Sequence, residues 1–148
     1  RLPGEIKSHT RVDGYVSLVD LFATILDYTQ VEEHPSDGTS LRGLIEGTDT
    51  DHGEYVVTEW NYRGDISPNY MVVRDGWKLM IPYSKSSSVI NALYDLNNDP
   101  HEMNNLLGSN PERVLYEERA EELRACLLEW LTKHDSKHVK GVKERKLI

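Results

Sequence analysis

Residues 92–106 read Ala-Leu-Tyr-Asp-Leu-Asn-Asn-Asp-Pro-His-Glu-Met-Asn-Asn-Leu. The apolar residues Leu93, Tyr94 and Leu96 are typical of the end of a strand, and the polar run after them stops it. Asn and Asp side chains bond the backbone two residues further on, while the ring of Pro100 restricts φ and removes a hydrogen-bond donor. The stretch therefore predicts a strand that ends in two consecutive turns.

The rest of the chain shows a helix near the N-terminus, strands in the middle and a long helix near the C-terminus. Apolar residues recur at helical spacing over residues 17–29, and Ser17 with Asp20 three residues later is expected to form an N-cap arrangement. Asp75 and Gly76 form a hairpin-turn dipeptide between two strands. Asn110 before a proline favours the start of a second helix. We expect strands at 55–60, 70–74, 77–82 and 89–96 and helices at 17–29, 40–45 and 110–134.

The net charge of the chain is −8, and it is unevenly distributed. Residues 135–148, here called the basic tail, hold five basic and two acidic side chains, so they carry +3 and the rest carries −11. An acidic chain lacks the basic face that phosphate backbones require, so we expect no nucleic-acid partner. No apolar run approaches the roughly 20 residues that span a bilayer, so we expect no membrane partner either. A basic tail can bind anions, but a solvated and frayed terminus is the favoured expectation for these residues.

Five short motifs lie in order along the chain, in residues 2–6, 16–26, 37–41, 71–79 and 93–106. They read Leu-Pro-Gly-Glu-Ile, Val-Ser-Leu-Val-Asp-Leu-Phe-Ala-Thr-Ile-Leu, Asp-Gly-Thr-Ser-Leu, Met-Val-Val-Arg-Asp-Gly-Trp-Lys-Leu and Leu-Tyr-Asp-Leu-x-x-Asp-Pro-x-Glu-x-x-Asn-Leu. The set resembles the C-terminal part of the sulfatase family, within the alkaline-phosphatase superfamily. The resemblance stops near residue 135. Because the chain begins inside the first motif, we expect it to be a piece of a longer protein.

Four antiparallel strands covered by one long helix form an α+β module, and the resemblance implies the same arrangement for the smaller C-terminal subdomain of sulfatases. We expect three segments: residues 1–50, the last helical pieces of the large α/β sulfatase domain; residues 51–134, the α+β subdomain; and residues 135–148, the basic tail. Without the parallel sheet of the large domain, segment 1–50 would expose apolar surface. Self-association of the isolated chain is one expected consequence.

The chemistry of a sulfatase is not encoded in these residues. The resemblance implies a bound Ca²⁺ and a formylglycine nucleophile made from Cys or Ser in a Cys/Ser-x-Pro-Ser/Ala-x-Arg motif, and the chain lacks that motif. Cys126 falls on the expected buried side of a helix, where a core thiol is the better interpretation. For Asp49, Asp51 and Glu54, an exposed acidic loop is favoured over a metal site. We predict no catalytic residue, no metal ligand and no cofactor in this chain, with formylglycine and Ca²⁺ held by the N-terminal catalytic part of the same protein.

One segment carries side chains suited to a sugar. Trp60, Asn61, Tyr62, Arg63 and Asp65 supply an aromatic platform, an amide, a guanidinium and a carboxylate. The resemblance implies that this subdomain contributes loops to the rim of the pocket, where they help to select the substrate. These five are the candidate substrate-rim residues. In the competing interpretation, Trp60 and Tyr62 cap the sheet and Arg63 pairs with Asp65.

Other polar residues of the motifs are expected to be structural. Arg74 and Lys78 flank the hairpin, and a salt bridge to Asp75 or Asp95 is favoured over the capture of an anion. Turn formation is the expected role of Asp95, Asp99, Pro100, Glu102 and Asn105.

The sequence thus predicts the C-terminal portion of a sulfatase-like hydrolase. The whole enzyme would hydrolyse sulfuric esters of a small molecule or a sugar, and this part would give structural support and part of the specificity rim. Two alternatives stay open. One is a stand-alone, non-catalytic interaction module; the other is a fragment of a phosphonate or phosphodiester hydrolase of the same superfamily.

Overall fold

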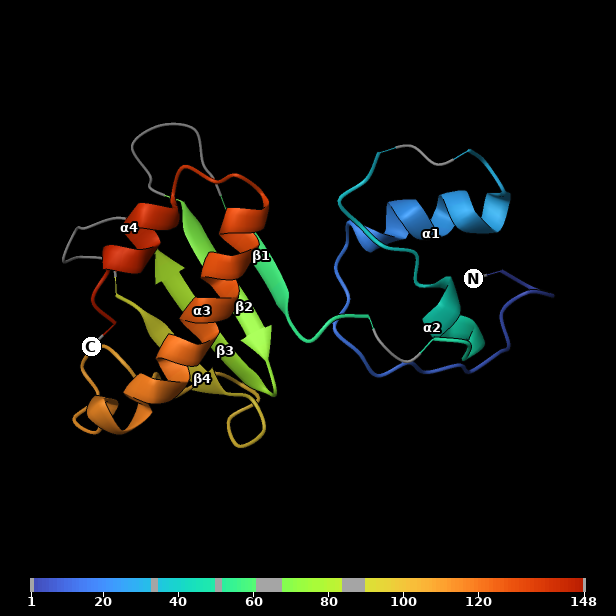
Figure 1. The fold of residues 1–148 in the computed structure, drawn as a ribbon. Coiled ribbons are helices and arrows are strands. Elements are labelled where there is room, and N and C mark those ends of the chain that lie inside the picture. The colour runs from blue at the N-terminus through green and yellow to red at the C-terminus, as the bar shows by residue number, and fades with distance from the viewer. Residues whose placement is uncertain (1, 33–34, 50–51, 61–67, 84–89, 148) are drawn as a thin grey trace. The chain divides into compact units, whose positions relative to one another are not determined.

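The computed structural model describes residues 2–32, 35–49, 52–60, 68–83 and 90–147. The chain divides into two compact units, Arg1–Val56 and Val57–Ile148 (Figure 1). The N-terminal unit is helical, whereas the C-terminal unit combines a sheet with helices. The division falls at the start of the first strand of that sheet.

The N-terminal unit contains the two helices α1 (Asp20–Thr29) and α2 (Arg42–Glu46), close to the predicted ranges. α1 begins three residues after Ser17 with Val19 at the N-cap position, and the predicted pair of Ser17 and Asp20 supplies one of the two bonds of a capping box. The Asp20 carboxylate, in the first turn, accepts the Ser17 backbone N–H at 2.7 Å. An acidic group at this end of the helix is stabilised by the helix dipole.

The apolar residues of α1 and of the turn before it are largely exposed. Leu18, Leu21, Phe22 and Ile25 expose between 48% and 85% of their surface. The buried positions of the helix are instead the polar Asp20 and Thr24. This helix therefore shows the exposed apolar surface that the sequence predicts for it.

The C-terminal unit is built on a four-stranded sheet in the order β1-β2-β3-β4. β2 pairs with β3, and β3 with β4, in antiparallel register. The predicted strands are confirmed, although the fourth is shorter than expected. Their bounds are Val56–Trp60 for β1, Asn69–Arg74 for β2, Trp77–Pro82 for β3 and Ala92–Asp95 for β4.

Asp75 and Gly76 make the turn between β2 and β3. Both have positive φ, 51° and 74°, as a type I′ turn requires, and this turn follows the twist of the strands. Gly76 also lies against a side chain of the motif at residues 93–106, here called the closing motif, because a Cβ there would come 2.2 Å from Nδ2 of Asn97. Both its φ and this close approach require a glycine.

The long helix covers one face of the sheet (Figure 1). It starts as the 3₁₀ helix η1 (Arg113–Tyr116) and continues as α3 (Glu117–Lys133), so the predicted helix is confirmed. The two layers share a core and make the predicted α+β fold. Buried apolar residues from both layers are Tyr70, Val72, Leu79, Ile81, Leu93, Ala120, Leu123, Cys126, Leu127 and Leu131.

The basic tail packs against the same unit, so the prediction of a solvated and frayed tail is wrong. It forms the helix α4 (Val139–Glu144), and both Val142 and Leu147 are buried. The side-chain amide of Asn91 donates to the carbonyl oxygens of Lys146 and Leu147 at 2.7 and 3.0 Å. The net charge of the tail does not reveal this docking. A helix can place its few apolar residues on one side, where they are buried, and its charged residues on the other.

The longest of the described helices, α3, is strongly charged. α3 has 17 residues, seven of them Glu or Arg. In the part of the chain that the structure describes, no helix combines the length and the apolar character needed to cross a bilayer.

Candidate functional site

Trp60, the first of the rim candidates, lies at the end of β1 and exposes 63% of its surface. An exposed indole offers a flat apolar face on which a sugar ring can stack. Asn61, Tyr62, Arg63 and Asp65 lie outside the described residues. The substrate-rim role of these five residues therefore stays a prediction.

The closing motif forms two turns, each held by an aspartate. Asp95 Oδ1 accepts the backbone N–H groups two and three residues further on, at 3.1 and 3.3 Å. Asp99 accepts the N–H groups of Met103 and Asn104 at 3.1 and 2.8 Å, one on each oxygen. The bonds from Asn104 and then Met103 hold the pKa of Asp99 below its ordinary value. Both aspartates are turn formers, as predicted.

Asn105 joins the closing motif to β4. Its Oδ1 accepts the N–H groups of Leu93 and Leu107, both at 3.0 Å. Its Nδ2 donates to the carbonyl of Asn91, also at 3.0 Å. One amide thus satisfies three backbone groups, and an aspartate could not, because it lacks the donor.

The two cations beside the hairpin have different partners. Arg74 Nε lies 3.4 Å from Asp75 Oδ2, as predicted. Lys78 instead pairs with Glu102, with Nζ 2.9 and 2.8 Å from its two carboxylate oxygens, so the predicted pairing of Lys78 with Asp75 or Asp95 is wrong. In the register of β3 and β4, Trp77 stands opposite Asp95. Lys78, one residue on, therefore points to the other face of the sheet.

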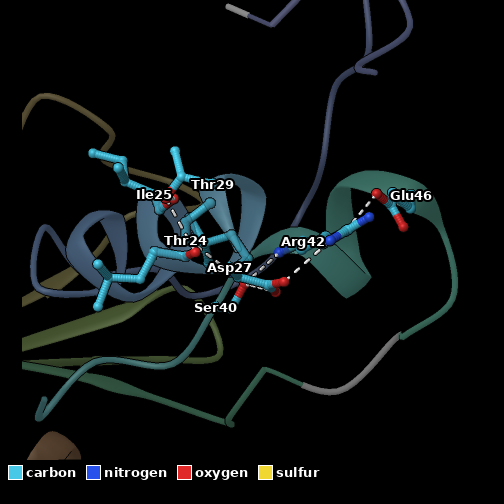
Figure 2. A network of polar contacts seen from close by, with 9 residues as sticks. Thr24, Ile25, Asp27, Thr29, Ser40, Arg42 and Glu46 are labelled. Carbon is cyan, nitrogen blue, oxygen red and sulfur yellow. Dashed lines mark hydrogen bonds and ion pairs between the residues drawn. The ribbon is translucent and has the colours of Figure 1, made fainter. Parts of the chain in front are cut away.

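A polar network joins α1 to the start of α2 (Figure 2). Asp27 accepts the hydroxyl of Ser40 at 2.6 Å and Nη1 of Arg42 at 3.1 Å. Nε of Arg42 also donates to Glu46 at 2.8 Å. The bonds from Ser40 and then Arg42 hold the pKa of Asp27 below its ordinary value. The network borders an open depression of about 880 Å³. The charged groups of the network bond one another, so we interpret them as structural.

Asp20 and His52 form a second polar pair of the N-terminal unit, with Nε2 of the imidazole 3.3 Å from Oδ2. Asp20 also accepts the N–H groups of Ser17 and Thr39 at 2.7 and 3.0 Å. Burial opposes the ionisation of Asp20, yet the bonds from Ser17, Thr39 and His52 outweigh it and hold its pKa below the ordinary value. The pair joins residues 32 apart in sequence, so no local pattern could have predicted it.

Comparison with known proteins agrees with these motif geometries. Residues 1–143 match the family model described as N-sulphoglucosamine sulphohydrolase, C-terminal. The chain belongs to the sulfatase family. The match corrects the expectation that the resemblance stops near residue 135, because it continues through most of the tail.

Relatives of this sulfatase chain are larger proteins. Human arylsulfatase K is 31% identical over 118 residues, which are 74% of this chain and 22% of the relative. A solved 2-O GAG sulfatase is 28% identical with a TM-score of 0.62, over 77% of this chain and 24% of that one. A protein solved with its substrate D-glucosamine-2-N,6-O-disulfate is 26% identical with a TM-score of 0.60, over 85% and 25% of the two chains. The chain thus spans about a quarter or less of these relatives' length.

The described residues of this sulfatase chain hold no cluster of candidate metal ligands. No group of three His, Cys, Asp or Glu side chains placed to hold a metal ion occurs among them, and Asp51 lies outside them. Cys126 is buried in α3, with Arg74 Nη1 3.4 Å from its sulfur, so the core interpretation of this thiol is confirmed. These residues do not fit a Ca²⁺ site or a formylglycine precursor.

Proposed function

We propose that this chain is the C-terminal subdomain of an enzyme that hydrolyses sulfuric esters. The observation that carries the proposal is the family match over residues 1–143, and the relatives that share it support it. Sulfate-ester hydrolysis needs a nucleophile and a cation to neutralise the sulfate oxygens. In this proposal both the formylglycine and the Ca²⁺ belong to the N-terminal catalytic part of the protein.

The chain itself supports that catalytic part and contributes to the substrate rim. Exposed Trp60 at the end of β1 is the described residue that favours this role. We expect Asn61, Tyr62, Arg63 and Asp65 to complete the rim beside it. The proposed substrate is a sulfated sugar, an inference supported by the N-sulphoglucosamine family description and by the disulfated glucosamine bound to one relative.

The first test expresses the full reading frame beside the 148-residue chain. Both are assayed for release of sulfate from an aryl sulfate and from N-sulfated glucosamine. The proposal expects release by the long form and none by the chain alone. Hydrolysis of a phosphodiester or phosphonate ester in place of sulfate esters would contradict it, and so would a long form that hydrolyses nothing.

The rim is tested in the long form with Trp60→Ala and the matched control Leu115→Ala, since Leu115 is also an exposed apolar residue of the same unit. Loss of a stacking platform is expected to raise KM for the sulfated sugar about fivefold, with little change for a small aryl sulfate. The control should leave both values unchanged. An equal KM for Trp60→Ala and the parent would remove Trp60 from the rim.

A further inference from the structure

The tail presents four lysines to solvent at a regular spacing. Lys137, Lys140, Lys143 and Lys146 recur every third residue through the turn before α4, the helix itself and the segment after it. All four are exposed, and the Lys140 side chain exposes 84% of its surface. Lys140 and Lys143, three apart within α4, are neighbours on the helix surface, while Lys137 precedes the helix and Lys146 follows it. These four lysines are called the lysine row below.

The backbone that carries the lysine row is held at several points. The Asn91 amide donates to the carbonyls of Lys146 and Leu147, and Arg124 Nη1 donates to the carbonyl of Arg145 at 2.6 Å. The Arg145 guanidinium, which is partly buried, bonds Oδ1 of Asn91. The row therefore belongs to a folded element and not to a frayed end.

The opposite side of the same segment is inserted into the unit. Val142 and Leu147 are buried, and Gly141 lies against the ring of Tyr83, where a Cβ would come 2.0 Å from Cε2. The Tyr70 hydroxyl bonds Nδ1 of His138, and burial raises the pKa of this tyrosine to about 12. With one side anchored in this way, the lysine side chains are left to solvent.

Few acidic groups within the tail offset the row. Glu144 lies 3.8 Å from Lys140, and Asp135 is the other acidic residue of the tail. The tail keeps a charge of +3 in a chain that is otherwise strongly acidic. A concentrated positive patch on an acidic protein attracts a polyanion while the remaining surface repels it.

We propose that the lysine row binds a sulfated glycosaminoglycan chain. The inference rests on the proposed function, since a sulfatase of sugars meets polymers that carry repeated sulfate groups. Each ion pair between an exposed lysine and a sulfate is weak, and several such pairs together give useful affinity. Several lysines can therefore hold a polymer that carries repeated sulfate groups. The surface would hold the polymer beside the enzyme and raise its local concentration.

The test measures binding of a heparan sulfate octasaccharide to the full-length protein by calorimetry at about 50 mM salt, where screening is weak. The variant pair Lys140→Gln with Lys143→Gln is expected to bind roughly fivefold more weakly than the parent. The matched control, Lys7→Gln with Arg11→Gln, removes two exposed cations of the other unit and should bind like the parent. A higher salt concentration should reduce the difference in octasaccharide affinity between the parent and the row variant, because salt screens the lysine charges.

Two results would overturn the proposal. One is equal affinity of the row variant and the parent at low salt. The other is binding of phosphatidylserine vesicles without binding of the octasaccharide, which would make the row a membrane contact. Release of sulfate from a small sulfated sugar, measured on the same parent protein, tests the proposed function separately. An inactive parent that still binds the octasaccharide through the row would refute the enzyme assignment and leave the surface in place.

Discussion

Asn105 is the residue on which the closing turn depends most, since its amide bonds three backbone groups at once. Asn105→Ala leaves two N–H groups and one carbonyl without these partners, and the expected loss is about 2 kcal/mol of unfolding free energy. Urea denaturation of the chain measures it. Asn104→Ala, at an exposed neighbouring position, is the control and should change stability by less than about 0.5 kcal/mol. Equal losses of unfolding free energy in the two variants would contradict the structural role given to the Asn105 amide.

Asp99 gives a pH-dependent prediction at the same scale. The N–H groups of Asn104 and Met103 lower the pKa of Asp99 in the folded chain. The ionised carboxylate therefore stabilises the fold above the unfolded pKa of about 3.9, and this stabilisation is lost as the pH falls through the lower folded pKa. Asp99→Asn should destabilise the chain at neutral pH. The difference in unfolding free energy between this variant and the parent should shrink below about pH 4. Urea titrations across that range test this. A gap that stays constant with pH would argue against a charged turn former.

These turn roles were predictable from sequence because an Asx turn is made within a few residues. The partner of Lys78 was not, because it depends on the register between β3 and β4 and on a motif residue 24 positions away. Asp75 lies three positions before Lys78 in the chain, whereas Asp95 lies 17 positions after it. The pleat of the strand put the Lys78 side chain on the other face from Asp95.

At the scale of elements, the docking of α4 makes a prediction through Gly141. Alanine normally favours a helix interior over glycine by about 1 kcal/mol. Here its Cβ would overlap the Tyr83 ring, so Gly141→Ala is expected to cost about 1–3 kcal/mol instead. Thermal and urea unfolding measure the change. Lys143→Ala, at an exposed site of the same helix, should be neutral or slightly stabilising, and a stabilised Gly141→Ala variant would show that α4 does not dock as described.

The helices and strands themselves were predicted well where periodicity and turn chemistry agree. The dipeptide Asp75-Gly76 predicted the hairpin, and the apolar stripe of residues 110–134 predicted α3. The tail was predicted poorly, because Val142 and Leu147 are too few to make a periodic signal. The backbone that follows α4 is held by Asn91, which lies more than fifty residues away.

At the scale of the whole molecule, the exposed apolar residues of α1 predict association of the isolated chain. Sedimentation velocity is expected to show oligomers that grow with concentration, since this much exposed apolar surface favours contact. Phe22→Glu with Ile25→Glu should shift the chain toward monomer. Val114→Glu with Leu115→Glu, two exposed apolar residues near the start of α3, is the matched control and should not. A parent chain that is monomeric at every concentration would contradict the prediction.

The sequence by itself determined the family, the order of elements and the turns of the closing motif, because each depends on chemistry shared by residues close in the chain. Tertiary structure alone decided which charges pair, that Asp20 meets His52, and that the tail folds back with its lysines outward. Those contacts join residues 24 to 56 positions apart. They form only when strand register and packing bring together groups that are far apart in the chain. A local sequence pattern does not show which distant residues will meet.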